Sequence, residues 1–256
     1  MSNKNISAVI LAAGRGDRIK STNSKVLLNV SGKPILIWTL ELLTDLGIKD
    51  IIVVVGYKAE SVKKIVKKYG FTSKFAFQKK LLGTAKAIQL GIKKMEKKSN
   101  DLLILYGDDS SLYKSEIIVK LIKHHVNKSI KGTLLVVRSN TPTTLGGLKR
   151  DSKGRLIGVM GKKEMVINKI KQNEILCGAM CFDGRWLEKN INLIKKNPKS
   201  GEYPFPEIIK IAAKKRQFLE TVVLQDQNQW NSMNFWGDYK QTKLKKELNL
   251  WKMKRR

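Results

Sequence analysis

The sequence predicts an α/β protein of the Rossmann-like, doubly wound class, in which helices cover both faces of a mixed sheet. Strand-like and helix-like segments alternate along the first half of the chain, which is typical of this class. Residues 51–55 are all β-branched, as expected for a strand buried on both faces. A chain of 256 residues is long enough to bury one substantial core.

The expected elements follow one another in regular order. In the first half we expect strands over residues 7–13, 51–55, 75–78, 102–106 and 133–137, and helices over 35–46, 60–69, 84–95 and 115–126. Pro34 favours a helix that begins at Ile35, because proline is tolerated in a first helical turn. In the second half we expect strands over 178–182 and 220–224, and helices over 186–196 and 205–214.

The pattern loosens between these halves. Gly146-Gly147, residues 151–154 and Gly161 separate short strands at hairpin spacing, which predicts a β-meander inserted as an addition to the sheet. We expect one domain over residues 1–237, followed by a basic amphipathic helix over 238–256. Leu244, Leu248 and Trp251 would share one face of that helix.

The chain is strongly basic, with 51 Lys and Arg residues against 21 Asp and Glu and a formal net charge of +30. Such a charge favours nucleic acid, anionic surfaces or phosphorylated substrates as partners. The lysines, however, lie on the polar faces of nearly every expected helix, which indicates a solvated surface. RNA binding ranks last because interleaved aromatic residues are missing, so we expect no specific nucleic acid partner. Two cysteines, no signal peptide and no membrane span predict a cytoplasmic protein.

A glycine-rich basic loop follows the first strand. It runs through Leu11, Ala12, Ala13, Gly14, Arg15 and Gly16. Small residues let the backbone approach a ligand closely, and the cations Arg15, Arg18 and Lys25 suit a triphosphate. The spacing matches neither a P-loop nor the dinucleotide fingerprint. By itself, the loop could also be an ordinary strand-to-helix turn with solvated arginines.

The residues that follow resemble a known family. The string from Leu11 to Ile19, then Lys25-Val26-Leu27 and Gly32-Lys33-Pro34, is similar to the signature of the sugar-phosphate nucleotidyltransferases. Within them the chain most resembles the uridylyltransferase domain that makes UDP-N-acetylglucosamine. The resemblance implies Mg²⁺ as cofactor and UTP and a sugar 1-phosphate as substrates, most simply N-acetylglucosamine 1-phosphate.

The resemblance also implies roles for individual residues. Gln78, Gly83 and Thr84 would bind the uracil, and Gly107, Asp108, Gly147 and Gly178 would bind substrate. Arg18 and Lys25 would be catalytic, stabilising the departing pyrophosphate. Asp108 and Asn234 would hold the metal, since Mg²⁺ prefers hard oxygen ligands. Without the family match, Asp108 would be taken for a turn or helix-capping residue.

Departures from the family pattern leave the acceptor open. Gly161 stands where the N-acetylglucosamine enzymes carry a glutamate, and Leu176 stands in place of an asparagine. Glu164 and Glu174 are candidates to replace the glutamate. Two alternatives remain. The first is the same fold with another nucleotide, such as dTTP or CTP, or with another acceptor, such as choline phosphate or another sugar phosphate. The second is a noncatalytic nucleotide-binding regulator. No acetyltransferase activity is expected, because the chain ends before the β-helix of the bifunctional enzymes.

Overall fold

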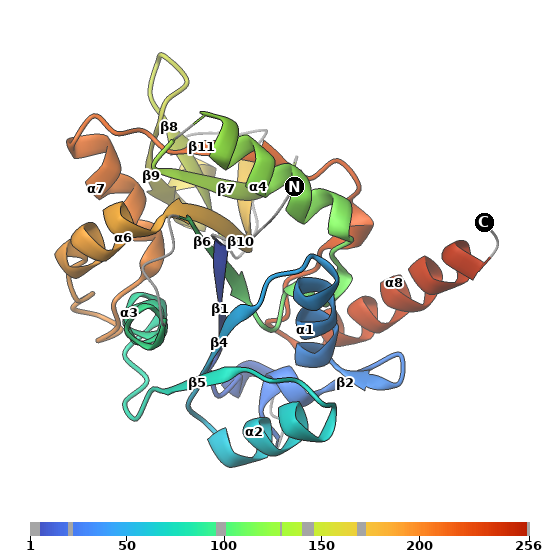
Figure 1. Cartoon of the computed structure of the whole chain (residues 1–256). Coiled ribbons are helices and arrows are strands. Elements are labelled where there is room, and N and C mark those ends of the chain that lie inside the picture. The colour runs from blue at the N-terminus through green and yellow to red at the C-terminus, as the bar shows by residue number, and fades with distance from the viewer. Residues whose placement is uncertain are drawn as a thin grey trace.

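A central sheet in the strand order β11-β7-β10-β6-β1-β4-β5 runs through the molecule (Figure 1). The computed structural model describes residues 6–19, 23–95, 101–128, 130–139, 146–167 and 173–254. The strands of this sheet are β1 (Ile6–Ala12), β4 (Asp50–Val55), β5 (Lys74–Phe77), β6 (Asp101–Tyr106), β7 (Gly132–Ser139), β10 (Asn173–Asp183) and β11 (Glu220–Val223).

The pairing of the strands makes the sheet mixed. β1 lies between β4 and β6 and is parallel to both, and β5 extends this parallel part beyond β4. β10 runs antiparallel to its neighbours β6 and β7, while β11 is parallel to β7. The predicted doubly wound mixed sheet is therefore confirmed.

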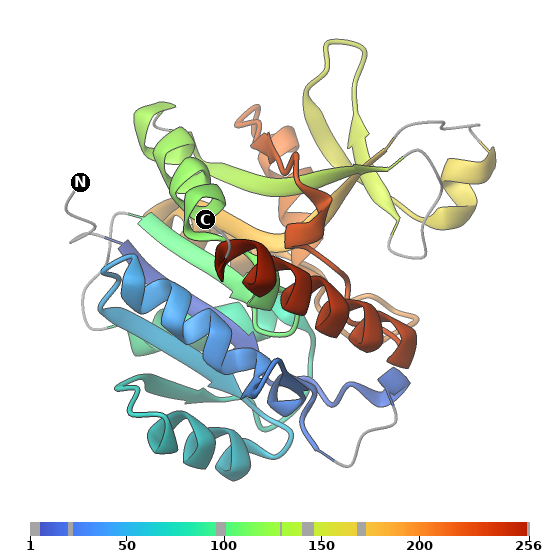
Figure 2. The same cartoon turned by 90° about the vertical axis from the view of Figure 1, so that its right-hand side faces the viewer.

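Helices cover both faces of the sheet, as Figure 1 shows. They are α1 (Ile35–Asp45), α2 (Ala59–Lys68), α3 (Thr84–Lys94), α4 (Ser115–Lys128), α6 (Gly184–Asn190) and α7 (Ile208–Lys214). Figure 2 looks onto the face that carries α1 and α4. One core joins α1, α2 and α4 to alternate residues of β1 such as Ala8 and Ile10. The other joins α3, α6 and α7 to the opposite face, where Val9 points. This alternation follows from the two-residue period of a strand.

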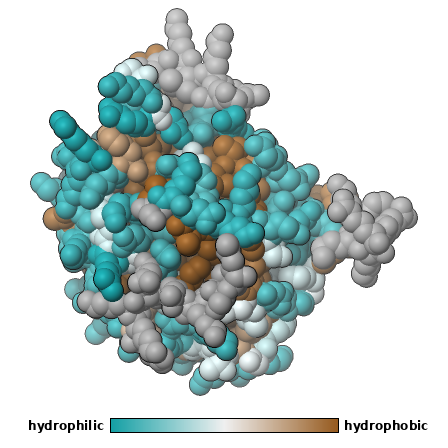
Figure 3. All heavy atoms as spheres, turned by 45° about the horizontal axis from the view of Figure 1, so that its top comes forward, coloured by the Kyte–Doolittle hydropathy of each residue, from teal (hydrophilic) through white to brown (hydrophobic). Residues whose placement is uncertain are grey.

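The predicted segments hold with local changes. The expected helix over residues 186–196 is shorter, because α6 ends at Asn190 and a 3₁₀ turn, Ile191–Leu193, follows it. A small hairpin, β2 (Asn29–Val30) with β3 (Lys33–Pro34), precedes α1. Hydrophilic residues cover most of the coloured surface in Figure 3, with apolar residues in the hollows between them, as a solvated lysine-rich surface requires.

The inserted lobe differs from the prediction in its pairing. β8 (Gly147–Arg150) and β9 (Leu156–Met160) form an antiparallel hairpin and a sheet of their own, so they do not extend the central sheet as expected. A short helix, α5 (Lys162–Ile167), follows the hairpin. The pairing of β10 with β7 shifts between Leu176 and Met180, and β10 also contacts β8. The bulge redirects β10, which allows the lobe to leave the plane of the sheet (Figure 2).

The C-terminal helix α8 (Trp236–Lys254) packs against the body with a polar face. Thr242 and Asn249 on this face are buried, whereas Leu244 and Leu248 are exposed at 60% and 56%. Leu244 and Leu248, which were predicted to share one face, therefore point away from the core, and the side chain of Trp251, the third residue of that predicted face, lies outside the described residues. Among the described residues, no helix combines the length and hydropathy that crossing a membrane would need.

Candidate active site

A cavity of about 1030 Å³ opens between the end of the parallel sheet and the inserted lobe. The carboxyl ends of parallel strands are the usual ligand crevice of such sheets, because the connecting loops diverge there. Of the residues predicted for the site, Leu11, Ala12, Ala13, Gly14, Arg15, Gly16, Lys25, Gln78, Gly83, Thr84, Asp108, Gly147 and Asn234 all line this cavity. Residues far apart in sequence thus meet in one place.

The glycine-rich loop leaves β1 at the floor of the cavity. The carbonyl of Ala13 accepts a hydrogen bond from the Tyr57 amide at 3.0 Å, which fixes the start of the loop. Gly16 has a φ of 71°, and a Cβ there would lie 2.9 Å from the Cβ of Lys25. Glycine is therefore needed to let the loop pass Lys25. The side chain of Arg18, predicted to be catalytic, lies outside the described residues.

The predicted base-binding residues form a closely packed corner. The buried Gln78 donates from Nε2 to the Gly83 carbonyl at 3.1 Å. Gly83 has a φ of 92°, and a Cβ there would lie 2.9 Å from the backbone of Tyr203. Thr84 begins α3, and its hydroxyl accepts a hydrogen bond from the Phe205 amide at 2.9 Å. These contacts fix the corner before any ligand arrives.

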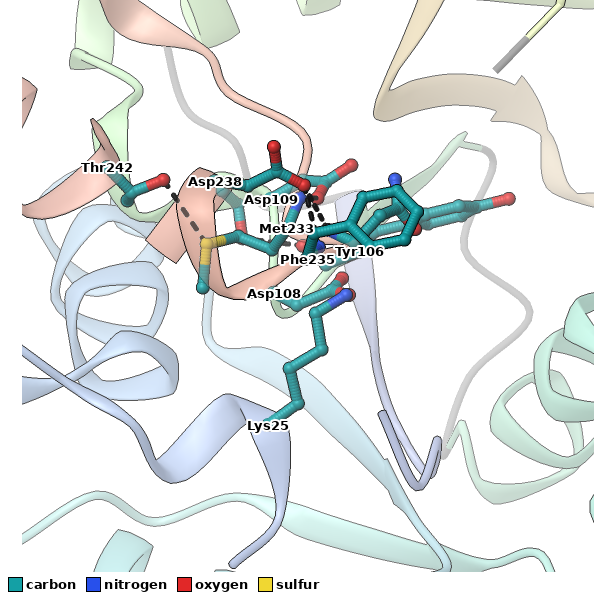
Figure 4. Close-up of polar contacts among 10 residues, drawn as sticks. Lys25, Tyr106, Asp108, Asp109, Met233, Phe235, Asp238 and Thr242 are labelled. Atoms are coloured by element: carbon teal, nitrogen blue, oxygen red, sulfur yellow. Dashed lines mark hydrogen bonds and ion pairs between the residues drawn. The ribbon is translucent and has the colours of Figure 1, made fainter. Parts of the chain in front are cut away.

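Charged residues gather at the end of β6 (Figure 4). The Lys25 ammonium forms an ion pair with the Asp108 carboxylate. Asp109 follows, and burial, together with the charge of Asp108, raises the pKa of Asp109 to about 8 against the opposing effects of Lys25 and of the Met233 amide. Asn234 lines the same cavity from the turn before α8.

The donors present suit a hard cation shared with substrate. Among the described residues, no group of three or more His, Cys, Asp or Glu side chains could enclose a metal by itself. Asp108 and Asn234 instead offer a carboxylate and an amide oxygen beside an open cavity. Mg²⁺ takes oxygen ligands and commonly completes its shell with water and substrate phosphates, so these residues fit it.

Two predicted site residues lie behind the cavity wall. A Cβ at Gly107 would come within 3.0 Å of the Leu11 carbonyl oxygen, so glycine allows β6 to end close against β1. Gly178 has a φ of 70°, and a Cβ there would lie 3.2 Å from Oδ2 of Asp109. Neither glycine is among the lining residues. Both glycines allow the backbone to pack closely behind the residues that line the cavity.

The lobe presents an apolar wall in its described part. It contributes Gly146, Gly147, Leu148, Val159, Met160, Gly161, Ile175 and Leu176 to the cavity. The two glutamates considered as replacements do not line it. Glu164 pairs with Lys149 at 2.9 Å, and Glu174 pairs with Arg150 at 2.5 Å.

Several lining residues were not assigned from the sequence. Asp109, Tyr106, Glu202 and Trp230 all line the cavity. The doublet Asp108-Asp109 at a strand end was a usable signal for Asp109, because carboxylates at that edge of a parallel sheet converge on the ligand crevice. Glu202 and Trp230 come from loops, whose path no local pattern specifies.

This combination of fold and cavity is typical of nucleotide-binding α/β proteins. The family model described as "Nucleotidyl transferase" matches residues 7–244, and the chain therefore belongs to the nucleotidyl transferase family. Nucleotidyltransferases of this family generally use divalent metal ions.

Individual relatives agree with this assignment. The chain is 31% identical over 213 residues to the "Bifunctional protein GlmU" of Staphylococcus saprophyticus, which covers 83% of this chain and 46% of the relative. It is 34% identical over 205 residues to the protein of the same name from Exiguobacterium sibiricum, covering 80% and 45%. The chain thus spans about half the length of the curated relatives it matches.

Solved structures share the fold. A putative glucose-1-phosphate thymidylyltransferase from Bacillus anthracis, in complex with a sucrose, has a TM-score of 0.75 at 20% identity and covers 93% of this chain and 94% of its own. HddC from Yersinia pseudotuberculosis, complexed with GMP-PN, has a TM-score of 0.67 at 22% identity and covers 93% and 98%.

Proposed function

We propose that the chain transfers a uridylyl group from UTP to a sugar 1-phosphate and releases pyrophosphate, with Mg²⁺ as the cofactor. N-acetylglucosamine 1-phosphate is the acceptor we favour, because the relatives at 31% and 34% identity are GlmU proteins. We propose the cytoplasm as its location.

The observation that carries this proposal is the meeting of three groups in one cavity. The glycine-rich loop, the corner made by Gln78, Gly83 and Thr84, and the Lys25–Asp108 pair all line it. Exposed backbone at Gly14 and Arg15 suits phosphate oxygens. The amide of Gln78 both donates and accepts, as does the edge of a uracil. A nucleoside triphosphate with a pyrimidine base would use all three.

The reaction needs positioning and charge stabilisation more than covalent chemistry. An oxygen of the sugar 1-phosphate attacks the α-phosphorus of UTP in line and forms a new P–O bond. The bond from that phosphorus to the bridging oxygen of the β-phosphate breaks, and both its electrons leave with pyrophosphate. Lys25 and Arg18 would neutralise the charge that develops on the leaving group.

Before substrate binds, Lys25 already has a partner within the protein. Its ammonium pairs with Asp108, and its side chain is only 12% exposed. A triphosphate that enters the cavity offers Lys25 stronger acceptors and leaves the Asp108 carboxylate available to the cation. Asp108 and Asn234 would hold Mg²⁺, which would supply positive charge to the substrate phosphates.

The test is pyrophosphate release with Mg²⁺, each NTP in turn, and a panel of N-acetylglucosamine, glucose and galactose 1-phosphates. We expect turnover with UTP and one of these sugars. Turnover with dTTP or CTP alone would replace the proposed base, and UTP binding without turnover on any acceptor would favour a regulator.

A further inference from the structure

The turn before α8 is held by carboxyl groups that accept from three consecutive backbone amides. The Met233 amide donates to Oδ1 of Asp109 at 3.3 Å. The amides of Asn234 and Phe235 both donate to Oδ2 of Asp238, at 2.8 and 2.7 Å (Figure 4). The middle residue of this turn is the candidate metal ligand.

Asp238 reaches its partners from the first turn of α8. The helix begins at Trp236, so Asp238 is its third residue. A carboxylate there can turn back over the helix end and accept from amides that have no helical partner. Its negative charge also lies at the positive end of the helix dipole. Asn231 donates to the backbone carbonyl of Asp238 at 2.7 Å, which fixes it from the other side.

Asp109 connects the two candidate metal ligands. It follows Asp108 directly in the chain, after the end of β6, and its side chain accepts a hydrogen bond from the amide of Met233, the neighbour of Asn234. One hydrogen bond and two peptide links therefore join Asp108 to Asn234 across 126 positions of sequence.

Two lysines further along α8 donate hydrogen bonds to the segments that carry Asp109 and Asn234. Lys246 donates to the carbonyl of Ser111, in the 3₁₀ turn that follows Asp109, at 2.7 Å. Lys245 donates to the Trp230 carbonyl at 3.0 Å, on the approach to the turn. These directional contacts, together with the packing of Tyr239 against Val30, Ile35 and Met233, hold α8 on the body.

We propose that Asp238, assisted by Asp109, is a positioning residue that keeps Asn234 in the cavity lined by Asp108. This inference rests on the proposed function where it takes Asp108 and Asn234 as the metal pair. Without the carboxylate of Asp238, the two amides lose their acceptor and the backbone of the turn is free to rotate. Asn234 would then leave the cavity, while the corner made by Gln78, Gly83 and Thr84, here called the nucleotide corner, stays intact.

The experiment measures UTP binding to the full chain by calorimetry, with EDTA and with Mn²⁺. Asp238→Ala should leave the Kd for UTP in EDTA unchanged. It should reduce the gain in UTP affinity that Mn²⁺ causes about ten-fold or more, because the loss of residues that orient metal ligands commonly has an effect of this size. Asp238→Asn keeps an acceptor oxygen and should recover most of this gain.

Asp183→Ala is the matched control. Asp183 caps α6 by accepting from the Trp186 amide at 2.9 Å and forms an ion pair with Lys131 at 2.8 Å; it lies opposite Asp101 in the strand register, at the start of β6 and away from Asp108. This variant should lose melting temperature as Asp238→Ala does but keep the full gain from Mn²⁺. An equal loss of that gain in both variants would overturn positioning, because a general loss of stability would then explain it.

The variant Asn234→Ala tests whether Asn234 is a metal ligand, separately from whether Asp238 positions it. Loss of the gain from Mn²⁺ in Asn234→Ala, with the gain retained in Asp238→Ala, overturns the positioning role and leaves the metal pair standing. A gain that survives Asn234→Ala removes Asn234 from the metal pair, and the positioning role falls with it.

Discussion

The side of the cavity proposed to bind the nucleotide, here called the nucleotide side, and the inserted lobe proposed to bind the acceptor are built in different ways. The nucleotide side is formed by loops at the ends of buried strands such as β1 and β6, and it contains the charged and amide side chains assigned to the site. The lobe is a separate two-stranded sheet that offers glycine and aliphatic residues in its described part. Under the proposed function, triphosphate chemistry would depend on the ends of the central strands, whereas acceptor choice would depend on the cavity-facing side of a lobe that packs on the core through Leu148 and Leu156.

The largest expected effect tests the charged side of this comparison. Lys25→Ala should lower kcat by about 10² to 10³-fold, because it removes a preorganised charge from the developing pyrophosphate. Circular dichroism and thermal melting should show a folded chain. Lys74→Ala is the control, since Lys74 forms an equivalent pair with Asp50 at 2.6 Å at the far end of the sheet. Equal activity of the two variants would remove Lys25 from the mechanism.

Glycines on the two sides should differ in their tolerance of a methyl group. Gly83→Ala places a Cβ 2.9 Å from the backbone of Tyr203 at a φ of 92°, so we expect a loss of about 2 kcal/mol or more in the free energy of unfolding and weaker UTP binding. Gly161→Ala meets nothing within 4 Å and should change stability by less than about 0.5 kcal/mol. Denaturant unfolding measures both. A tolerant Gly83 would contradict the view of a rigid nucleotide corner.

A smaller effect is expected from a polar group placed on the lobe wall. Leu176→Asn should lower the KM of a sugar 1-phosphate by up to about ten-fold, because it gives a hydroxyl a partner, while the KM of UTP stays constant. Leu81→Asn, a cavity-lining leucine beside the nucleotide corner, should change the KM of UTP instead. Steady-state kinetics with both substrates varied distinguish the two variants. If Leu176→Asn altered the UTP KM equally, the two sides would not be separable.

The smallest effect concerns the helix that supports the nucleotide side. Burial lowers the pKa of Lys246 to about 8, against the attraction of Glu41. The unfolded chain binds this proton up to the ordinary lysine pKa near 10.4, so from pH 8 upward the folded state holds fewer protons and this group makes stability rise with pH. Lys246→Met should reduce the gain in melting temperature between pH 7.5 and 9.5. Lys243→Met, at an exposed position of the same helix, should keep the gain.

Local patterns predicted most of the elements that carry the nucleotide side. Residues 51–55 are apolar and β-branched, and β4 is buried as such a run requires. Pro34 precedes α1 as expected. The lobe differs from the prediction, because β8 pairs with β9 and not with the central sheet, and local sequence patterns do not specify which distant strands pair. The leucine face of α8 was visible in the sequence, but whether it packs inward was not.

The sequence by itself determined the order of strands and helices, the glycine-rich loop and the family, because these depend on local periodicity and on residue types at fixed spacing. Only the tertiary structure decided that Asp109 lines the cavity, that Glu164 and Glu174 do not, and that Asp238 holds the turn of Asn234. These are relations between side chains on separate elements. Their distances are set by how helices and strands pack, and no spacing along the chain encodes that geometry.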